Sequence, residues 1–577
     1  MRRISTLFVY ATIASTLAGC SEGDEDSDTT ASSLATGPTG VSMTGQTGQT
    51  GQTGEPSETL GTSATTSSTS SDTGNSETGT TTATTSATTT TATTQGIKLD
   101  VGEAPDFGGN DTEEEPVVPT CDNIDTLTAT SVGCEFWGAQ VPSNASALPY
   151  GISVGNPSEE LTAHIVIEDM RGEGGSLREI VSFDLPPKSS ELTKINGNGG
   201  LLNEDHMLMA AGFHQHGSFR VRSDVPVTAM QLFPVGGGSS HVSEASLMLP
   251  VNALDTAYIG MGWKDISDNG GWVAVLALED ATTVTTNLGN TMLDAFDVQL
   301  YRPGSDASGF FVGADVPVAV YSGSQCTLIP GLPWYACDHL EEQLVPLSSW
   351  GNNYVAARHP HRVAQINPQP EEVYWRVIAA VENTTITLDP PVPGVGGSID
   401  LASVGDHSDF PAVESFTAQS DNPFMLVQFM SGCYNVVKDS GNSGNCNQGP
   451  TGDPYMIQIP PVEQWLTSLP FLTDTSYPRD YVTIMREAGT EVTLDCLGVV
   501  SDDHFTAIPG TTYEYGHVTL DMDGQGGEGN CSDGEQFIHA NGPIGILVMG
   551  LDWATSYGYP GGLNLKGLWV PPQEPPG

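Results

Sequence analysis

Basic residues are scarce in this sequence. Lys and Arg together number 18, against 70 Asp and Glu, and the formal net charge is −52. A surface with this excess of negative charge repels phosphate backbones and anionic lipid, so we expect no nucleic-acid partner. The same surface attracts divalent cations, although solubility alone is a sufficient reason for it.

Long apolar runs are scarce too. The apolar stretch after Arg2 and Arg3 ends at Cys20 and is too short to span a bilayer stably, which is typical of an export signal. The segment Leu17–Cys20 (LAGC) resembles a bacterial lipobox, in which the signal is cut before the cysteine and the thiol then carries lipid. We therefore predict a lipoprotein signal peptide at residues 1–20 with lipidation at Cys20. The alternative is an ordinary cleaved signal that contains a cysteine.

The residues after the lipobox bear on the location. Ser21 resembles the sorting preference for the outer membrane in other bacteria, whereas the acidic run from Asp24 to Asp28 leaves the inner membrane open. We predict an exported protein that is lipid-anchored to the bacterial cell envelope, preferably at the outer membrane and facing outward. Its contact with the membrane would be through the lipid alone.

Aromatic residues are missing from Ser21 to Thr94, and large apolar side chains are rare there. Such a segment cannot bury enough surface to offset its chain entropy. We predict that residues 21–119 form a disordered, acidic tether rich in Thr, Ser and Gly. A flexible chain of that length has a root-mean-square reach of about 50 to 60 Å.

Cysteines number nine, and eight remain without Cys20. An even number in an oxidising compartment suggests disulfides, and bonds between sequence neighbours would stabilise the fold by about 2 to 4 kcal/mol each. The neighbours are Cys121 with Cys134, Cys326 with Cys337, Cys433 with Cys446, and Cys496 with Cys531. This pairing is an interpretation, because eight cysteines allow many connectivities. No two of them form a C-x2-C pair, so a zinc site is not expected. We predict no metal and no cofactor.

Helical periodicity is rare beyond Cys121. Trp, Tyr, Phe and Val become frequent, and turn residues recur every eight to twelve positions or so, which is typical of an all-β fold. We assign residues 120–577 to one all-β body.

A short sequence motif, which we call the proline phrase, occurs four times in this body. SDVPVTAMQLF, ADVPVAVYSG, SDNPFMLVQFMSG and ANGPIGILVMG place prolines at Pro226, Pro317, Pro423 and Pro543, about 90 to 120 residues apart, which indicates duplicated units. Proline is tolerated at the first residue of a strand, so we expect each proline to open one. Both faces of the following strand are apolar, which predicts a strand covered on both sides. We therefore predict antiparallel sheets in about four related units, either propeller-like or as stacked sandwiches.

Pairs of strand-like runs precede three of these phrases. Residues 273–286, 377–388 and 482–494 each contain two such runs, separated by Asp, Asn or Gly. These are the residues that a tight reversal needs, so we predict that the two runs pair as a β-hairpin.

Four segments resemble a known family. They are CEFWGAQV from Cys134, FRVRSDVPVTAMQ from Phe219, CDHLEEQLVPLSSWGNNYV from Cys337 and GDPYMIQIPPVEQW from Gly452. Together they are similar to the IgGFc-binding protein N-terminal domain family, in the form found in surface lipoproteins of myxobacteria. The resemblance covers nearly the whole body and implies an extracellular binding or adhesion role. It implies neither antibody binding nor any catalytic residue, since one fold hosts many partners.

One cluster has the composition of an acid-base site. Asp338 and His339 are followed by Glu341 and Glu342, and carboxylates beside an imidazole are able to transfer protons. The cluster adjoins the Cys326–Cys337 pair, so a structural role between units is the competing interpretation.

Other patterns are weaker. Gly151–Gly155 matches G-x-S-x-G but is followed by a turn and a second strand, whereas a nucleophile elbow needs a helix. Asp521–Gly524 begins like a calcium loop, but Ser532 stands where an EF-hand has Glu. Histidines that could hold a metal, without the helical H-E-x-x-H motif, are His206, His214, His216, His359 and His361.

Aromatic residues in loops are candidates for a binding face or a sugar platform, with packing in the core as the alternative. They are Trp334, Tyr335, Trp553, Tyr557 and Tyr559. Taken together, these features predict a lipid-anchored surface protein that presents a rigid β body to an extracellular protein or glycan ligand, and not an enzyme. The alternatives are an extracellular hydrolase using Asp338, His339 and Glu341, or a structural component of the envelope or matrix.

The lipobox gives a direct prediction. Mass spectrometry of the mature chain from the cell envelope should find residue 20 at the N-terminus with acyl chains on its thiol. A mature chain with an unacylated Cys20 would contradict the anchor.

Overall fold

The structure is a computed structural model. It describes residues 119–574, except 146, 205, 268, 332–336, 363, 365–368, 438–448 and 450. The chain divides into two units, Met1–Thr90 and Thr91–Gly577, and every described residue belongs to the second. The signal peptide, Cys20 and nearly all of the tether lie outside the described residues, so these assignments and their boundaries stay predictions.

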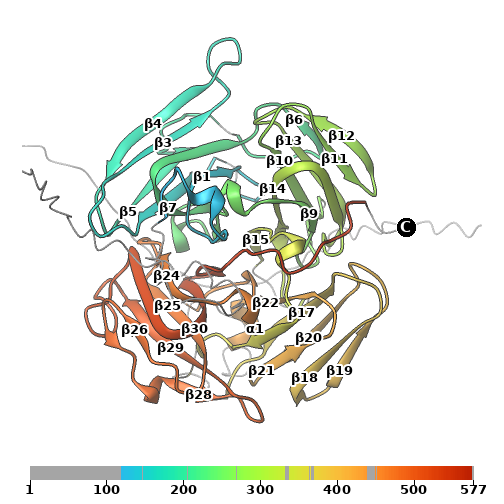
Figure 1. Ribbon diagram of the computed structural model, residues 1–577, viewed down its shortest axis with the longest axis vertical. Coiled ribbons are helices and arrows are strands. Elements are labelled where there is room, and N and C mark those ends of the chain that lie inside the picture. Colours follow the sequence, from blue (N-terminus) through green and yellow to red (C-terminus); the bar gives the residue numbers. More distant parts are fainter. Residues whose placement is uncertain are drawn as a thin grey trace, which may run out of the picture. The chain divides into compact units, whose positions relative to one another are not determined.

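Strands make up almost all of the regular structure, which confirms the all-β class, and they form four related groups (Figure 1). The first comprises β1 (Gly133–Gly138), β2 (Tyr150–Asn156), β3 (Ala163–Asp169), β4 (Arg178–Leu185), β5 (Ser189–Asn196), β7 (Phe219–Phe233) and β8 (Glu244–Leu247). The second comprises β9 (Asp255–Ile259), β10 (Gly271–Ala277), β11 (Thr282–Thr286), β12 (Gly289–Leu293), β13 (Val298–Gly304), β14 (Phe311–Thr327) and β15 (Asp338–Gln343), and β6 (Gly212–His214) joins its edge.

The third group comprises β16 (Asn353–Ala356), β17 (Val373–Ala379), β18 (Thr384–Val392), β19 (Gly396–Leu401), β20 (His407–Ala412), β21 (Phe416–Gln419), β22 (Phe424–Phe429) and β23 (Met456–Gln458). The fourth comprises β24 (Leu466–Leu472), β25 (Arg479–Glu487), β26 (Val492–Leu494), β27 (Gly498–Val499), β28 (Phe505–Ala507), β29 (Tyr513–Met522), β30 (Glu535–Asp552) and β31 (Thr555–Pro560). The short helices are η1 (Ile124–Thr126), η2 (Gly237–Ser239), η3 (Val251–Ala253), η4 (Leu347–Ser349), α1 (Cys433–Val437), η6 (Val462–Gln464) and η7 (Asp502–His504).

Every unit consists of two half-sheets, and in three of the four units the half-sheets share one long strand. The first half of β14 pairs with β9 and β11, and its second half pairs with β10 and β15. β7 and β30 change partners in the same way. In the third unit the long strand is divided into β21 and β22, which belong to separate sheets. The repeated unit is therefore built from antiparallel half-sheets, which confirms the predicted antiparallel sheets in related units.

The repeated proline marks the point where the long strand changes partners. Pro226, Pro317 and Pro543 lie inside β7, β14 and β30, and Pro423 lies between β21 and β22. The expectation that each proline opens a strand is therefore wrong for three of the four. The physical reason is that the ladder is interrupted at this point, so the missing N–H costs no ladder hydrogen bond.

The residues directly after these prolines are fully buried, which agrees with the prediction of a strand covered on both faces. They are Val227, Val318, Phe424 and Ile544.

The residue two positions before the repeated proline stabilises the backbone where the strand ladder is interrupted. Asp224 Oδ1 accepts a hydrogen bond from the His164 amide at 2.7 Å, and Asp315 Oδ1 accepts one from the Thr283 amide at 2.8 Å. Asn541 does the same for the backbone of Glu491. These side chains satisfy strand amides at the interruption, which explains why the phrase carries Asp or Asn before its proline.

The predicted hairpins are not hairpins. β10 and β11 pair with opposite halves of β14 rather than with each other, and β17 and β18 lie in different sheets. The short turn between them, with Ala281 at φ +62° and Asn383 at φ +55°, carries the chain from one half-sheet to the other. Turn residues between two strand-like runs indicate a reversal but do not determine which sheet receives the second strand. The actual hairpins are the next pairs along the chain, β11–β12, β18–β19 and β26–β27.

Equivalent tyrosines hold the point where the long strand changes partners in the second and third units. The Tyr258 hydroxyl donates to the carbonyl of Val318 at 2.8 Å, and the Tyr354 hydroxyl donates to the carbonyl of Phe424. Both acceptors directly follow the repeated proline. This bond within the unit is thus duplicated along with the unit.

The C-terminal segment joins the fourth unit to the first. The Ser131 amide donates to the carbonyl of Leu563 at 3.1 Å. Gln464 Nε2 donates to the carbonyls of Ser349 at 3.0 Å and Lys566 at 2.9 Å, so the segment is also held against η4 and η6. Figure 1 shows it, in red, crossing between the groups of strands.

Three of the four predicted disulfides are present: Cys121–Cys134, Cys326–Cys337 and Cys496–Cys531. Cys433 is disulfide-bonded, and its predicted partner Cys446 lies outside the described residues. Among the described residues, no helix has the length and apolar character needed to cross a membrane.

Candidate functional site

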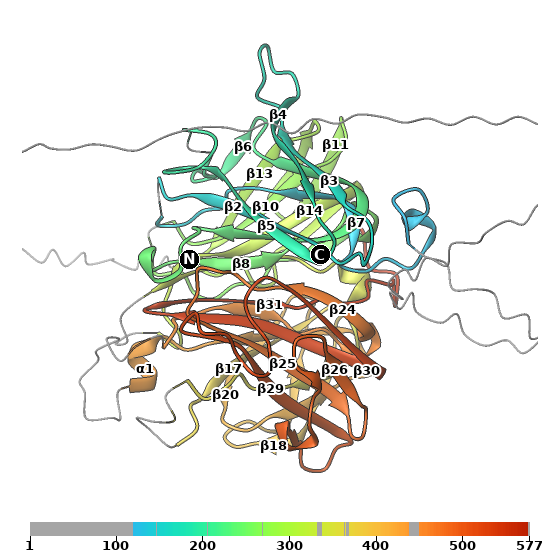
Figure 2. The same ribbon diagram turned by 90° about the vertical axis from the view of Figure 1, so that its left-hand side faces the viewer.

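The inner strands β8, β15, β23 and β31 bring the four units together. β8 contacts β15 and β31, and β23 contacts the same two strands. Figure 2 shows β8 and β31 side by side. Each inner strand follows the long strand of its unit across a loop, and these four inner loops are residues 234–243, 328–337, 430–455 and 553–554.

Side chains of the inner strands bond to the backbone of neighbouring units. Ser246 Oγ accepts from the Gln343 amide at 2.6 Å, and Gln458 Nε2 donates to the Gln343 carbonyl at 2.8 Å. Glu244 Oε1 accepts from the Gly558 amide at 2.9 Å. All of these side chains are buried, so each bond satisfies a polar group that water does not reach.

The inner loops of the four units are hydrogen-bonded to one another. Asp552 Oδ2 accepts from the Gly238 amide at 2.5 Å, and its carbonyl accepts from Gly452 at 3.0 Å. The Gly432 amide donates to the carbonyl of Ile329 at 3.0 Å. The described residues of these loops therefore form one connected surface, which we call the loop end.

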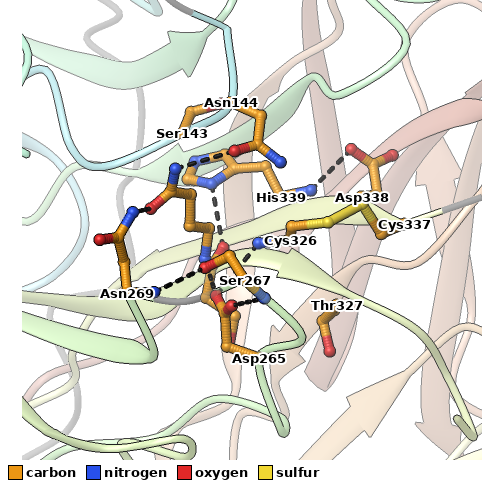
Figure 3. The surroundings of a disulfide bond; sticks show 12 residues. Ser143, Asn144, Asp265, Ser267, Asn269, Cys326, Thr327, Cys337, Asp338 and His339 are labelled. Carbon is orange, nitrogen blue, oxygen red and sulfur yellow. Dashed lines mark hydrogen bonds between the residues drawn. A yellow bond between two sulfur atoms is a disulfide. The ribbon is translucent and has the colours of Figure 1, made fainter. Parts of the chain in front are cut away.

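The Cys326–Cys337 disulfide holds the base of the loop between β14 and β15 (Figure 3). Asp265 Oδ2 accepts from the amides of Gln325 at 2.5 Å and Cys326 at 3.1 Å. Gln325 Nε2 in turn donates to Asn144 Oδ1 at 2.8 Å. The disulfide is thus part of a network that reaches from the second unit to the chain of the first.

The candidate acid-base cluster next to this disulfide is fully buried. His339 Nε2 lies 3.0 Å from Glu341 Oε2, whereas Asp338 Oδ2 accepts from Thr555 Oγ1 of the fourth unit at 3.1 Å. The side chains of His339 and Glu341 are 0% exposed. The carboxylate of Asp338 is therefore directed to another unit, and a substrate has no access to the cluster. These residues connect units, as the competing structural interpretation predicts.

Burial raises the pKa of several carboxyls around the inner strands. The pKa values of Glu244, Asp338, Glu342 and Asp453 all lie well above their ordinary range because the charged form is desolvated. The negative charge of Asp453 raises the pKa of Asp338 further. In its protonated form such a carboxyl can donate as well as accept hydrogen bonds. None of the described residues supplies a hydrogen-bond partner for Glu244 Oε2, Glu342 Oε1 or Asp453 Oδ2.

The described residues contain no group of three or more His, Cys, Asp and Glu side chains arranged to hold a metal ion. His206 Nε2 lies 2.7 Å from Glu204, and His214 Nε2 lies 2.7 Å from the carbonyl of Ala210. His359 is buried, and its Nδ1 lies 2.9 Å from the Pro360 carbonyl. These histidines have separate local partners.

Two other sequence patterns have structural explanations. Ser153 of the G-x-S-x-G pattern is buried inside β2 and is not on an elbow. Asp521 Oδ2 accepts from the Gly524 amide at 2.7 Å and Oδ1 from the Gly526 amide at 2.8 Å, so this carboxylate closes a turn.

The candidate aromatic residues divide into buried and exposed. Tyr557 and Tyr559 are core residues, with 0% and 1% exposure, whereas Trp553 is 42% exposed at the loop end. Its ring centroid lies 4.4 Å from that of His241, with the two rings at 87°. Trp334 and Tyr335 lie outside the described residues.

Sequence reasoning missed His241, Glu244 and Asp453. Glu244 and Asp338 are each the first residue of an inner strand, but the residue of β15 that corresponds to Glu244 is Leu340, so the repeat gives no signal for Glu244. Nothing local distinguishes His241, because its neighbour Trp553 is more than 300 residues away along the chain.

The geometry defines a rigid all-β scaffold that presents connected loops at one end, an arrangement typical of a binding module. Comparison with known proteins agrees with this class. The profile of the IgGFc binding protein family matches residues 244–550, and the chain belongs to this family. It is 24% identical over 362 residues to the IgGFc-binding protein of Homo sapiens, an alignment that covers 58% of this chain and 6% of the human protein. The chain therefore corresponds to a small part of that relative.

The buried carboxyls predict an unusual pH dependence of stability. In the folded protein the pKa of Glu342 lies above its ordinary value of 4.5. Its stabilising contribution is therefore complete below about pH 4.5 and is lost as the pH rises through the raised pKa. Glu342→Gln, which is neutral at every pH, should raise the free energy of unfolding by about 1 to 3 kcal/mol at pH 8 and change it little at pH 4.

Denaturant unfolding at pH 4, 6 and 8 measures this difference. Glu279→Gln, which makes the same change on an exposed side chain, is the matched control and should have little effect at any of these values. A Glu342→Gln variant that is equally destabilised at pH 4 and pH 8 would contradict a protonated carboxyl at this position.

Proposed function

We propose that this chain is a lipid-anchored binding protein of the bacterial cell envelope, which presents the loop end of its β body to an extracellular protein or glycan. The observation that carries the proposal is the hydrogen bonding among the inner loops of all four units. The residues of these loops that the structure describes, held in this way, lose little conformational entropy when a ligand binds, which favours affinity. Membership of a family named for binding supports the same class.

The location rests on the sequence. The lipobox at Cys20 supports a lipid anchor, and the composition of residues 21–119 supports a tether that lifts the body away from the membrane. Disulfides among the described residues suit an oxidising compartment outside the cytoplasm. The net charge of −52 favours ligands that are neutral or basic.

The two other functions have less support. A hydrolase that uses Asp338, His339 and Glu341 would need these side chains in an accessible cleft, and all three are buried. A purely structural role in the envelope or matrix would require extensive contacts between copies, which cross-linking on intact cells would detect as abundant self-contacts.

A matched pair of variants tests whether ligands bind at the loop end. Ser239→Arg places a large cation on an exposed position of this surface, and Asn290→Arg makes a similar change on the hairpin β11–β12. The full mature chain, solubilised in detergent, is used to capture proteins and glycans from a cell-surface extract. Ser239→Arg should lower the amount captured about tenfold, which corresponds to about 1.4 kcal/mol, and Asn290→Arg should leave it unchanged.

Equal capture by Ser239→Arg and the unmodified chain would contradict binding at the loop end. Capture of nothing but the chain itself would favour the structural role.

A further inference from the structure

Trp553 occupies a position where the fold does not require a large apolar side chain. It forms a two-residue turn with Ala554, and Asp552 pairs with Thr555 across this turn. Such turns favour Gly, Asn, Asp and other small or polar residues. Trp553 is nevertheless present and 42% exposed, and it is the one exposed large apolar side chain among the described residues of the inner loops.

The turn that carries Trp553 is held rigidly. Asp552 Oδ1 accepts from the Trp553 amide at 2.6 Å, while Oδ2 accepts from the Gly238 amide at 2.5 Å. A Cβ atom at Gly238 would lie 2.7 Å from Asp552 Oδ2, so glycine is needed for this close approach. The backbone that carries the indole is therefore held in place before any ligand arrives.

His241 supports the indole from the neighbouring loop. Its ring centroid lies 4.4 Å from that of Trp553, at an angle of 87°. His241 has a φ of +60°, a left-handed conformation that is uncommon for residues other than glycine. No described residue is hydrogen-bonded to its ring nitrogens, which leaves them available to a ligand.

The surroundings of the pair are polar, with the Asp552 carboxylate bonded to backbone amides of the turn and serines on the neighbouring loop. Ser239 and Ser240 donate to the carbonyls of Gly236 and Gly237, and their oxygens are still able to accept. A protein interface of ordinary size buries a patch with an apolar centre, whereas here a single aromatic side chain stands among Gly and Ser. A sugar ring matches this pattern better, because it offers C–H groups to the indole and hydroxyls to imidazole and serine.

We propose that Trp553 and His241 form a subsite for one sugar ring of a neutral glycan. The indole contacts the C–H face of the sugar, and His241 with Ser239 and Ser240 binds its hydroxyls. The strongly negative chain excludes acidic polysaccharides from this subsite. The inference rests on the proposed function, because it names the ligand class for the loop end.

Isothermal titration of the full mature chain in detergent tests the subsite. The probes are neutral hexasaccharides of glucose, mannose, galactose and N-acetylglucosamine, with oligogalacturonate as the acidic probe. At least one neutral probe should bind, and oligogalacturonate should not. Trp553→Ala should weaken binding of that neutral probe at least tenfold, and Trp553→Phe, which keeps an aromatic ring, about threefold.

Two controls separate binding from folding. Phe213→Ala removes another exposed aromatic side chain, 54% exposed on β6, and should not change the affinity. Thermal unfolding of Trp553→Ala should stay within about 2 °C of the unmodified chain, since the side chain is not part of the core.

Two results would overturn the subsite: no neutral hexasaccharide binds, or Trp553→Ala binds as tightly as the unmodified chain. If no glycan binds but Ser239→Arg still abolishes capture from the surface extract, the ligand class is wrong and the proposed function stands. If both measurements are negative, the loop end is not a binding surface.

Discussion

Buried polar side chains on the inner strands must find their partners across the boundaries between units, and the rest of the structure depends on this constraint. An unpaired buried polar group costs about 1 to 3 kcal/mol, so the units are stable only in the register that pairs them. Ser246, Gln458 and Glu244 meet this requirement by bonding to the backbone of a neighbouring unit. The same bonds set the starts of the inner strands, and with them the positions of the inner loops.

The sequence predicts the architecture well where the relevant information is local. Four proline phrases indicate the duplication, and an apolar pattern on both faces predicts the covered strand that begins near Val227 and its equivalents. Cysteines close in sequence are paired in the structure where both are described. The hairpin prediction fails because the turn at Ala281 reverses the chain whether or not the two flanking strands pair with each other. Only the packing of the two half-sheets determines that β10 and β11 pair with opposite halves of β14.

The candidate site is harder to predict for the same reason. Asp338, His339 and Glu341 are neighbours in sequence and resemble a catalytic group, but their burial depends on Thr555 and on strands from other units. Trp553 is recognisable as a loop aromatic, whereas its partner His241 is identified only when two distant loops are brought together. Residue types predict what a side chain is able to do, and tertiary contacts decide whether a ligand reaches it.

The central claim is that bonds between the inner strands hold the inner loops in place. Hydrogen exchange of backbone amides at the loop end tests this claim most directly. Thr555 Oγ1 accepts from the Ser243 amide at 2.9 Å and donates to Asp338 Oδ2 at 3.1 Å, and Thr555→Val removes both bonds with little change in shape. We expect amides in residues 236–243 and 552–554 to exchange about tenfold faster in this variant, with exchange in β18 and β19 unchanged. Unchanged exchange in the inner loops would show that their order does not depend on the bonds between the inner strands.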